Sequence, residues 1–359
     1  MSETNEKWIY DITEFPYKRE ISKRVTYPFF LLNKVTGGGE IGNVIILFSK
    51  TNNGKSELMM QFITHWAQTG EKVCAMLGEH TYKKAQELLF KKVSKYDKDK
   101  WQTKAVTDNE GKDIGIYETF ISKEDEENAI HTLKGKVYLY NTNKGFSLDK
   151  ILQGFQAGYD IGCTVFVLDN QMMIDLETNY ELREQTDNTE RLRQWAKKHQ
   201  VVICLVAHAR KIEVNRIRLT ESDINGSSNI SNKAQTIMTI TRTDTLNPTT
   251  KEYRDYAKLL ELNYINIHKC NAILEVVKEK NAKGGFVPLK WFESTKTFRE
   301  VYDPEMMQKK QEDAKKREQK YDKQNNDDID VEQPVLFNPH PEEMVELTPS
   351  MLDSLPWDD

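Results

Sequence analysis

Residues 49–56 read SKTNNGKS and lie between an apolar run and an amphipathic stretch. A phosphate-binding loop has the pattern glycine, four residues, glycine, lysine and then serine or threonine. Here Gly54 lets the backbone approach a β-phosphate, Lys55 reaches the β and γ oxygens, and the Ser56 hydroxyl can bind Mg²⁺. Serine replaces the first glycine of the pattern. The predicted nucleotide-binding residues are Ser49, Lys50, Thr51, Asn52, Asn53, Gly54, Lys55 and Ser56.

Three further residues follow apolar runs and carry side chains that nucleotide hydrolysis needs. Asp169 closes CTVFVLD and is the expected second metal ligand, and Glu79 follows VCAML and would polarise the attacking water. His208 ends VVICLVAH and could sense the γ-phosphate. Each also has a structural alternative: a turn residue or helix cap for the two acids, and a hydrogen-bonded framework residue for the histidine.

The elements that must position these residues form an alternating pattern. Apolar runs predict strands, helical periodicity follows the phosphate loop at 55–68, and a second helix extends to about residue 95. Further helices are predicted near 123–134 and at 181–199, whereas 96–130 otherwise looks like an irregular excursion. Strands that are apolar throughout and alternate with helices indicate an α/β fold with a mainly parallel sheet and an antiparallel edge. The predicted strands are 44–48, 73–77, 136–140, 163–168, 201–206, 235–241, 272–277 and 286–292.

Composition excludes several classes of protein. The chain has 38% hydrophobic residues in total, yet no apolar run approaches the ~18–20 residues that span a bilayer, and its polar start lacks a signal-peptide core. We therefore expect a cytoplasmic protein with no membrane partner. The cysteines and histidines show no metal-ligand spacing, which argues against a zinc site and for buried free thiols. The cysteines are Cys74, Cys163, Cys204 and Cys270.

The body and the C-terminal tail of the chain carry net charges of opposite sign. Residues 324–359 contain ten acidic residues and no Lys or Arg; because the whole chain has net charge −5, this leaves about +5 on residues 1–323. A mildly basic body permits an anionic partner. We expect an N-terminal arm at 1–30, a core at 31–303, a charged helical linker at 304–323 and a disordered acidic tail at 324–359.

The order of these motifs resembles the DnaB-like hexameric replicative helicases, and most closely their phage and mitochondrial branch. The stretches that carry the resemblance, over about residues 30–302, are TGGGEIGNVIILFSKTNNGKS, MLGEHTYKKAQELL, VFVLDNQMMI, LVAHARK, SDINGSSNISNKAQTIM with ITRTD, and VVKEKNAKGGFVPLKWFESTKTFREV. The resemblance implies a RecA-like ATPase core that uses ATP and Mg²⁺. It also implies a ring, most simply a hexamer, that moves on single-stranded DNA to unwind duplex, and a phage origin.

The resemblance further implies two sets of residues outside the nucleotide loop. A basic residue of the C-terminal hairpin acts on the neighbouring subunit's γ-phosphate, and Lys278 and Lys280 are the candidates; the family usually has arginine where Lys280 stands. The family's DNA-binding loop matches Asn225 and Gly226. We add Lys211 and Arg216 to that loop from their charge alone, because basic side chains can follow a phosphate backbone without reading bases.

Two departures from the family leave alternatives open. We expect no large N-terminal domain, since only about 30 residues precede the core, so residues 1–30 could pack on the next subunit of a ring. The acidic tail ends LDSLPWDD, in which Pro356 and Trp357 could dock on a primase, a loader or another replication protein. The tail could instead only aid solubility, or compete with DNA. The whole chain could also be a filament-forming recombinase, or a nucleotide-gated scaffold that does not translocate.

Overall fold

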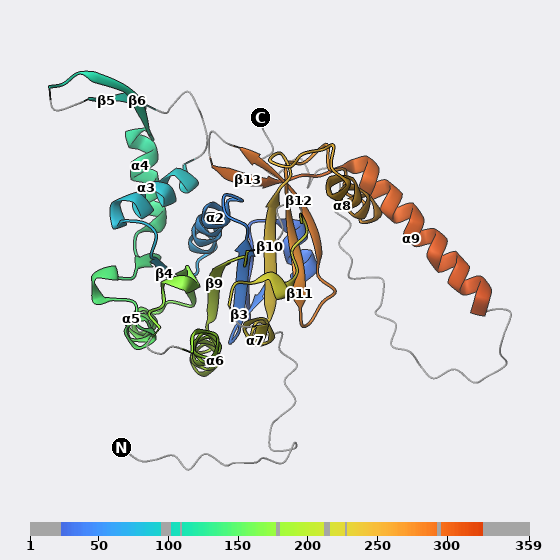
Figure 1. Ribbon diagram of the computed structural model, residues 1–359, viewed down its shortest axis with the longest axis horizontal. Helices are drawn as coiled ribbons and strands as arrows, with labels where there is room; N and C mark the ends of the chain where they lie inside the picture. Colours follow the sequence, from blue (N-terminus) through green and yellow to red (C-terminus); the bar gives the residue numbers. More distant parts are fainter. Residues whose placement is uncertain are drawn as a thin grey trace, which may run out of the picture. The chain divides into compact units, whose positions relative to one another are not determined.

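The main sheet positions every candidate site residue. The computed structural model describes residues 23–94, 102–107, 110–176, 180–211, 216–226, 228–292 and 296–325, and within these the main sheet has nine strands (Figure 1). In spatial order they are β13 (Thr297–Glu300), β12 (Gly285–Phe292), β11 (Ala272–Glu279), β10 (Thr236–Arg242), β3 (Val44–Ser49), β9 (Val202–His208), β8 (Val165–Asp169), β4 (Val73–Leu77) and β7 (Val137–Leu139).

The sheet is parallel from β10 to β7 and antiparallel from β10 to β13. This confirms the predicted α/β fold with an antiparallel edge. The strand that follows the phosphate-loop helix, β4, does not pair with β3, because β9 and β8 lie between them. All four strands still point the same way, so their carboxyl ends share one edge of the sheet.

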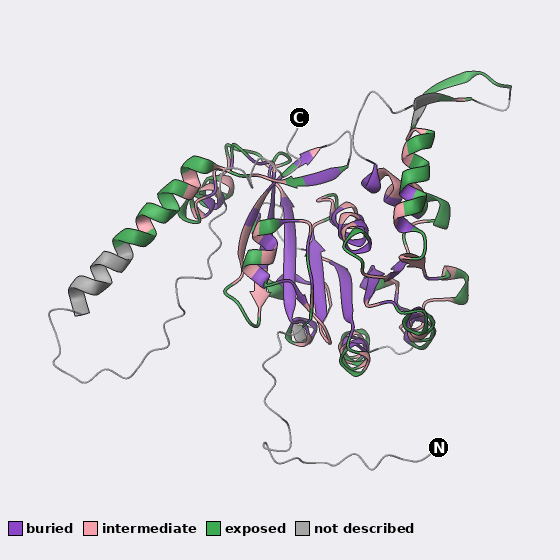
Figure 2. Cartoon of the chain, turned by 180° about the vertical axis from the view of Figure 1, so that it is seen from behind, coloured by how far each residue is buried: buried purple, intermediate pink, exposed green. Residues whose placement is uncertain are grey.

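Helices cover both faces because successive residues of each strand point to opposite sides. On β3, Ile45 and Leu47 face one core cluster, and Val44, Ile46 and Phe48 face the other. The first face is covered by α1 (Phe30–Thr36), α2 (Lys55–Gln68), α3 (Tyr82–Val93) and α4 (Lys123–Leu133). The second is covered by α5 (Leu148–Asp160), α6 (Glu181–His199) and α7 (Ser228–Lys233). Figure 2 shows the strands buried between these layers.

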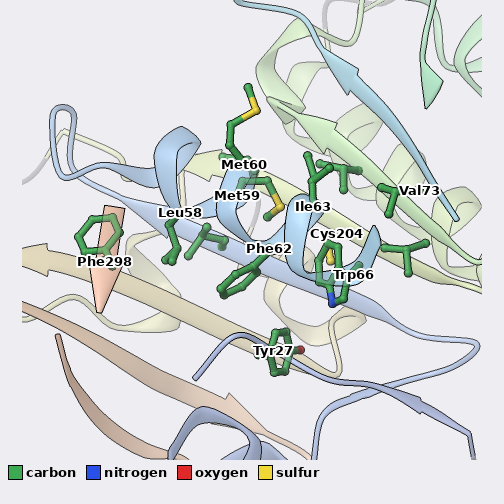
Figure 3. Packing of buried hydrophobic residues seen from close by; sticks show 14 of the residues in the cluster. Tyr27, Leu58, Met59, Met60, Phe62, Ile63, Trp66, Val73, Cys204 and Phe298 are labelled. Atoms are coloured by element: carbon green, nitrogen blue, oxygen red, sulfur yellow. The ribbon is translucent and has the colours of Figure 1, made fainter. Parts of the chain in front are cut away.

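An aromatic cluster fixes the helix that carries the nucleotide loop. Phe62 and Trp66 of α2 pack on Tyr27, with ring centroids 5.2 and 6.4 Å from the tyrosine ring (Figure 3). The indole N–H of Trp66 also donates to the carbonyl oxygen of Thr26, 2.7 Å away. Burying aromatic side chains of this size stabilises the packing by about 2–3 kcal/mol each. These contacts anchor α2, the helix that begins at Lys55, to the segment before α1.

The segment before α1 also belongs to this core. β1 (Arg24–Val25) pairs with β2 (Gly39–Glu40), and Val25, Tyr27 and Phe29 are buried. The described part of the predicted N-terminal arm thus packs on its own chain. Residues 1–22, the rest of that arm, lie outside the described residues.

Several parts of the fold were not predicted. β5 (Gln102–Thr107) and β6 (Asp113–Phe120) pair antiparallel, so the expected irregular excursion at 96–130 is wrong for this hairpin. Gly111 precedes β6 and Gly115 lies within it, where the register shifts, and both have the positive φ that glycine adopts readily. The helices α5 and α8 (Lys251–Leu262) were also missed, and α8 packs Tyr256 and Leu260 against Ile273 of β11.

The contacts divide the chain after Met306. The helix α9 (Pro304–Asn325) covers the stretch for which a charged helix was predicted. The acidic tail lies outside the described residues from 326 onward, including Pro356 and Trp357. No helix among the described residues is long and apolar enough to cross a membrane.

Candidate nucleotide site and nucleic-acid interface

The nucleotide loop joins β3 to α2 in the way that the sequence predicted. β3 ends at Ser49, α2 begins at Lys55, and Gly54 has a φ of 84°. A side chain at Gly54 would place a Cβ 2.8 Å from the ring of Phe298, so both backbone conformation and space require glycine here. Ser49 ends a strand and is fully buried, with its hydroxyl donating to the carbonyl oxygen of Lys50. Serine therefore fits where the motif has glycine.

The carboxyl ends of neighbouring strands gather the other predicted residues beside this loop. His208 pairs in register with Ser49, and Asp169 pairs with Leu77, two residues before Glu79. The ammonium of Lys55 lies 3.4 Å from Nδ1 of His208. We call Ser49–Ser56, Glu79, Asp169 and His208 the phosphate edge. The structure thus brings together all of the residues predicted to bind or hydrolyse a nucleotide within one chain.

One residue of this edge was missed from the sequence. The side-chain amide of Asn170 donates to Oε1 of Glu79 and lies 3.1 Å from Nε2 of His208. Asn170 is buried and joins two strand ends that are far apart in the sequence. Its position directly after Asp169 at the end of an apolar strand was the available signal.

Burial makes the carboxylate of Asp169, the predicted metal ligand, costly to ionise without a cation. Burial, and next the nearby Glu79 carboxylate, raise the pKa of Asp169 from 3.8 to about 6. Ser56 donates a hydrogen bond to this carboxylate and, with Lys55, opposes the rise. A hydroxyl beside a buried carboxylate is a hard oxygen set, which fits Mg²⁺ completed by phosphates and water. The described residues hold no cluster of three or more His, Cys, Asp or Glu for a self-contained metal site.

Lys55 is buried beside the same carboxylates. Burial lowers the pKa of the Lys55 ammonium, while Asp169 and Glu79 oppose the shift. The lysine is thus a buried cation with acidic neighbours, and an anionic phosphate would compensate for the hydration that its ammonium has lost. This arrangement can bind a polyphosphate, hold a divalent cation and orient a water molecule beside Glu79.

Other residues of the loop are held by segments that come later in the chain. The ammonium of Lys50 donates to the carbonyl oxygen of Arg216, 2.5 Å away. The backbone N–H of Arg242 donates to Oδ1 of Asn53, 2.7 Å away. Thr51 and Asn52 are exposed at the loop tip, and Asn52 has a positive φ of 64°. Lys50 therefore ties the nucleotide loop to the backbone at Arg216.

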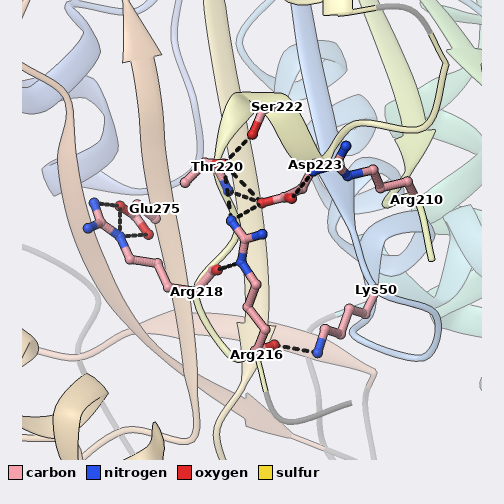
Figure 4. A network of polar contacts seen from close by, with 8 residues as sticks. All are labelled: Lys50, Arg210, Arg216, Arg218, Thr220, Ser222, Asp223 and Glu275. Atoms are coloured by element: carbon pink, nitrogen blue, oxygen red, sulfur yellow. Dashed lines mark hydrogen bonds and ion pairs between the residues drawn. The ribbon is translucent and has the colours of Figure 1, made fainter. Parts of the chain in front are cut away.

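The buried carboxylate of Asp223 contacts residues of the segment predicted to bind DNA, residues 211–227 (Figure 4). Asp223 is fully buried, and its oxygens lie 2.7 Å from Arg216 and 3.3 Å from Arg210. It also accepts from the backbone N–H of Thr220 in a capping box that begins the short helix η5 (Glu221–Asp223). The charge of Arg216, predicted to meet DNA, is therefore partly neutralised within the chain. Lys211 is exposed.

The segment predicted to bind DNA is joined directly to the phosphate edge. The backbone N–H of Asn225 donates to the carbonyl oxygen of His208, and Ala209 forms a bridge with Ile224. Gly226 has a φ of 112°, a backbone conformation that would strain any other residue, and a Cβ there would also displace the side-chain amide of Gln185. Residues 212–215 and 227, which complete this segment, lie outside the described residues.

The hairpin lysines lie at the opposite ends of the strands from the nucleotide loop. β11 runs antiparallel to β10, and its end at Glu279 pairs with Thr236, which pairs with Ile45 at the beginning of β3. Lys280 follows this end and is exposed. Lys278 is engaged, with its ammonium donating to the carbonyl oxygen of Ser231 at 2.8 Å. Lys280 is thus not brought to its own chain's phosphate edge.

Comparisons with known proteins agree with this architecture. A model of the family described as "DnaB-like helicase C terminal domain" matches residues 25–300. No curated protein matches. A solved ATPase domain superposes with a TM-score of 0.61 at 14% identity, over 78% of this chain and 92% of that one. A DnaB-like replicative helicase, described with its interactions with primase, gives the same score and identity, and 62% of its chain is covered.

Proposed function

The chain belongs to the DnaB-like helicase family, whose members are ATP-dependent replicative DNA helicases, and we propose that its phosphate edge binds Mg²⁺–ATP and drives movement along single-stranded DNA. The family match covers more than half of the chain and confirms the resemblance drawn from the motifs. The observation that carries the proposal is the convergence of Lys55, Asp169 and His208 at one sheet edge, with His208 bonded to the DNA segment.

Each residue of the phosphate edge has a proposed part in hydrolysis. Lys55 and the loop amides hold the β- and γ-phosphates, and Ser56 and Asp169 hold Mg²⁺, directly or through water. Mg²⁺ neutralises charge on the phosphates when it is bound. Glu79 polarises the water that attacks the γ-phosphorus, and the ADP oxygen leaves with the bond electrons. Supporting this, Glu79 is half exposed beside the buried lysine and aspartate.

Coupling to DNA is proposed to run through the bond between His208 and Asn225. A change at His208 on nucleotide binding shifts the backbone of Asn225 and Gly226, which would hold DNA phosphates through backbone and basic groups. Lys211 and Arg216 add positive charge to this segment, which makes binding salt-sensitive and tolerant of sequence.

Lys280 is proposed to complete the active site of a neighbouring subunit. Its place at the edge opposite its own nucleotide loop supports this, because a nucleotide bound by its own chain would lie at the other ends of the strands. We propose a ring of copies, most simply a hexamer, acting in the cytoplasm of a host cell and encoded by a phage. The acidic tail is proposed to bind a primase, a loader or another replication protein.

The first test is the ATPase rate with and without single-stranded DNA, with Lys55→Ala as the matched variant. Loss of the lysine should lower the DNA-stimulated rate about 100-fold or more, because it removes a preorganised cation from the transferred phosphate. A forked-duplex assay then tests unwinding. ATP binding without turnover on any DNA would contradict the motor and favour a nucleotide-gated scaffold. Turnover without unwinding would favour a filament former.

A further inference from the structure

Lys278, near the end of β11, contacts residues on both sides of the turn that contains Asn225 and Gly226. Its ammonium donates to the carbonyl oxygen of Ser231 in α7, 2.8 Å away, and lies 3.8 Å from Oε2 of Glu221 in η5. Glu221 precedes residues 224–226, which we call the DNA turn, and Ser231 follows them. One side chain therefore bridges the two ends of this turn.

A bulge in β11 directs Lys278 toward these partners. The pairing with β10 skips Val277, because Val276 pairs with Met238 and Lys278 pairs with Ile237. Without this extra residue, Lys278 would share the face of Val276, which packs in the cluster of the first face of the sheet. With it, Val277 packs on the second face, and Lys278 turns to α7 on that same face.

β11 also holds the chain that leads into the DNA turn. The carboxylate of Glu275 is buried on this strand and accepts hydrogen bonds from Nε of Arg218 at 2.9 Å and from Nη2 at 2.5 Å (Figure 4). Arg218 lies three residues before Glu221, and Glu275 lies three residues before Lys278. Successive positions of one strand therefore fix the chain before the turn and the helix after it.

The two hairpin lysines, which the family resemblance treats as equivalent candidates, differ in their surroundings. The side chain of Lys278 is 22% exposed and is held by a carbonyl oxygen and a carboxylate. Lys280 is exposed, and its ammonium has no hydrogen bond or ion pair with any described residue. To reach a phosphate of another subunit, Lys278 would have to give up both of its partners, whereas Lys280 would give up only water.

We propose that Lys278 is a positioning residue that fixes both ends of the DNA turn of its own chain, and that it does not act on a neighbour's nucleotide. The inference rests on the proposed function for the ligand, single-stranded DNA, and on the contacts alone for the positioning. A turn that is already held in its binding conformation loses less conformational freedom when it binds. Removing the ammonium therefore weakens DNA binding without removing a contact to DNA.

Hydrogen exchange tests the positioning without DNA or nucleotide. Lys278→Met keeps the aliphatic stem and removes the ammonium; Lys283→Met removes the same charge from an exposed position of the same hairpin and is the matched control. The amide of Asn225 donates to the carbonyl oxygen of His208, so peptides that contain it report how firmly the DNA turn is held. Exchange there should be about fivefold faster in Lys278→Met and within about twofold of wild type in the control. Equal exchange in the two variants would overturn the proposal.

Binding of a fluorescent oligo(dT) in Mg²⁺–ADP separates positioning from two other roles. ADP has no γ-phosphate, so a lysine that acts only on a neighbour's γ-phosphate does not change DNA affinity there. Lys278→Met should raise Kd about 10-fold and leave the slope of log Kd against log salt unchanged. A slope smaller by about 0.7 would mean that Lys278 contacts a DNA phosphate itself. That slope, or an unchanged Kd, would overturn the proposal.

Thermal unfolding checks that each variant is folded. If Lys278→Met does not fold, Glu221→Gln takes its place, because it keeps the size of an exposed side chain and removes only the ion pair. Exchange at Asn225 should then rise about twofold, since the weaker of the two contacts is lost, and wild-type exchange would overturn the proposal. If the wild-type protein bound no single-stranded DNA, the proposed function would fail, while hydrogen exchange would still decide whether Lys278 holds the turn.

Discussion

The backbone N–H of Asn225 lies 2.8 Å from the carbonyl oxygen of His208 and donates to it. The histidine side chain faces the nucleotide loop, and its backbone holds the segment proposed to bind DNA. His208 therefore contacts the nucleotide loop through its side chain and the segment proposed to bind DNA through its backbone, and we propose that a shift of His208 would move that segment directly.

Replacing Asn225 by proline should uncouple the two sites. Proline has no N–H, and Ile224 has a ψ of 132°, which suits a residue before proline. The ratio of ATPase rates with and without single-stranded DNA should fall about 10-fold relative to Asn225→Ala, since that variant loses the side chain and keeps the N–H. Equal stimulation of the ATPase by DNA in the two variants would show that this hydrogen bond does not couple the nucleotide loop to the segment proposed to bind DNA.

Glu79→Gln should bind ATP and fail to hydrolyse it. The amide keeps the shape of the side chain but cannot take a proton from water, which costs about 10²–10⁴ in rate. Titration with a fluorescent ATP analogue measures binding, and phosphate release measures turnover. Turnover at the wild-type rate would mean that another group activates the water.

Mixing two inactive variants tests the role of Lys280 in a neighbouring site. Lys55→Ala lacks its own nucleotide loop lysine and Lys280→Ala lacks the hairpin lysine, and each should be inactive alone. In mixed assemblies, the intact loop of one copy meets the intact Lys280 of another, so DNA-stimulated ATPase should partly recover. The control is each variant mixed with itself, and no recovery at any ratio would place Lys280 outside the active site.

Asp223→Ala should destabilise the fold. It removes a fully buried carboxylate that pairs with two arginines and caps η5, which should cost about 2–4 kcal/mol. The matched control is Asp187→Ala, at an exposed ion pair with Arg183, which should change the free energy of unfolding by about 0.5 kcal/mol or less. Urea denaturation measures both, and equal midpoints would contradict the importance of the buried network.

The thiols should be unreactive in the folded protein. All four cysteines are free and buried, as predicted, and burial raises the pKa of Cys74 and of Cys270 to about 12 and of Cys163 to about 11. Burial also raises the pKa of Cys204. Because the thiolate is the nucleophile, a disulfide reagent at pH 8 should label none natively and all four in denaturant. Rapid labelling of one native thiol would reveal an opening of the core.

Local sequence determined the gathering of the phosphate edge. Lys55, Asp169 and His208 each follow or end an apolar run, and parallel strands between helices bring such ends to one edge whatever their spatial order. For the same reason Glu79, which follows β4, could be predicted to join this site although β4 lies three strands away from β3. The hairpin at 102–120 could not, because its strands are polar and show weak periodicity.

Only the tertiary structure decided which side chains meet across strands. Asn170 contacts Glu79 and His208 because β8 lies between β4 and β9, and Lys50 turns to Arg216 rather than toward the buried lysine. The same holds for Lys280, whose place at the opposite edge follows from the antiparallel pairing of β10 with β11. A residue's type and its place at a strand end are local properties that sequence records. Hydrogen bonds between such ends depend on strand order and register, which long-range packing of the whole core fixes.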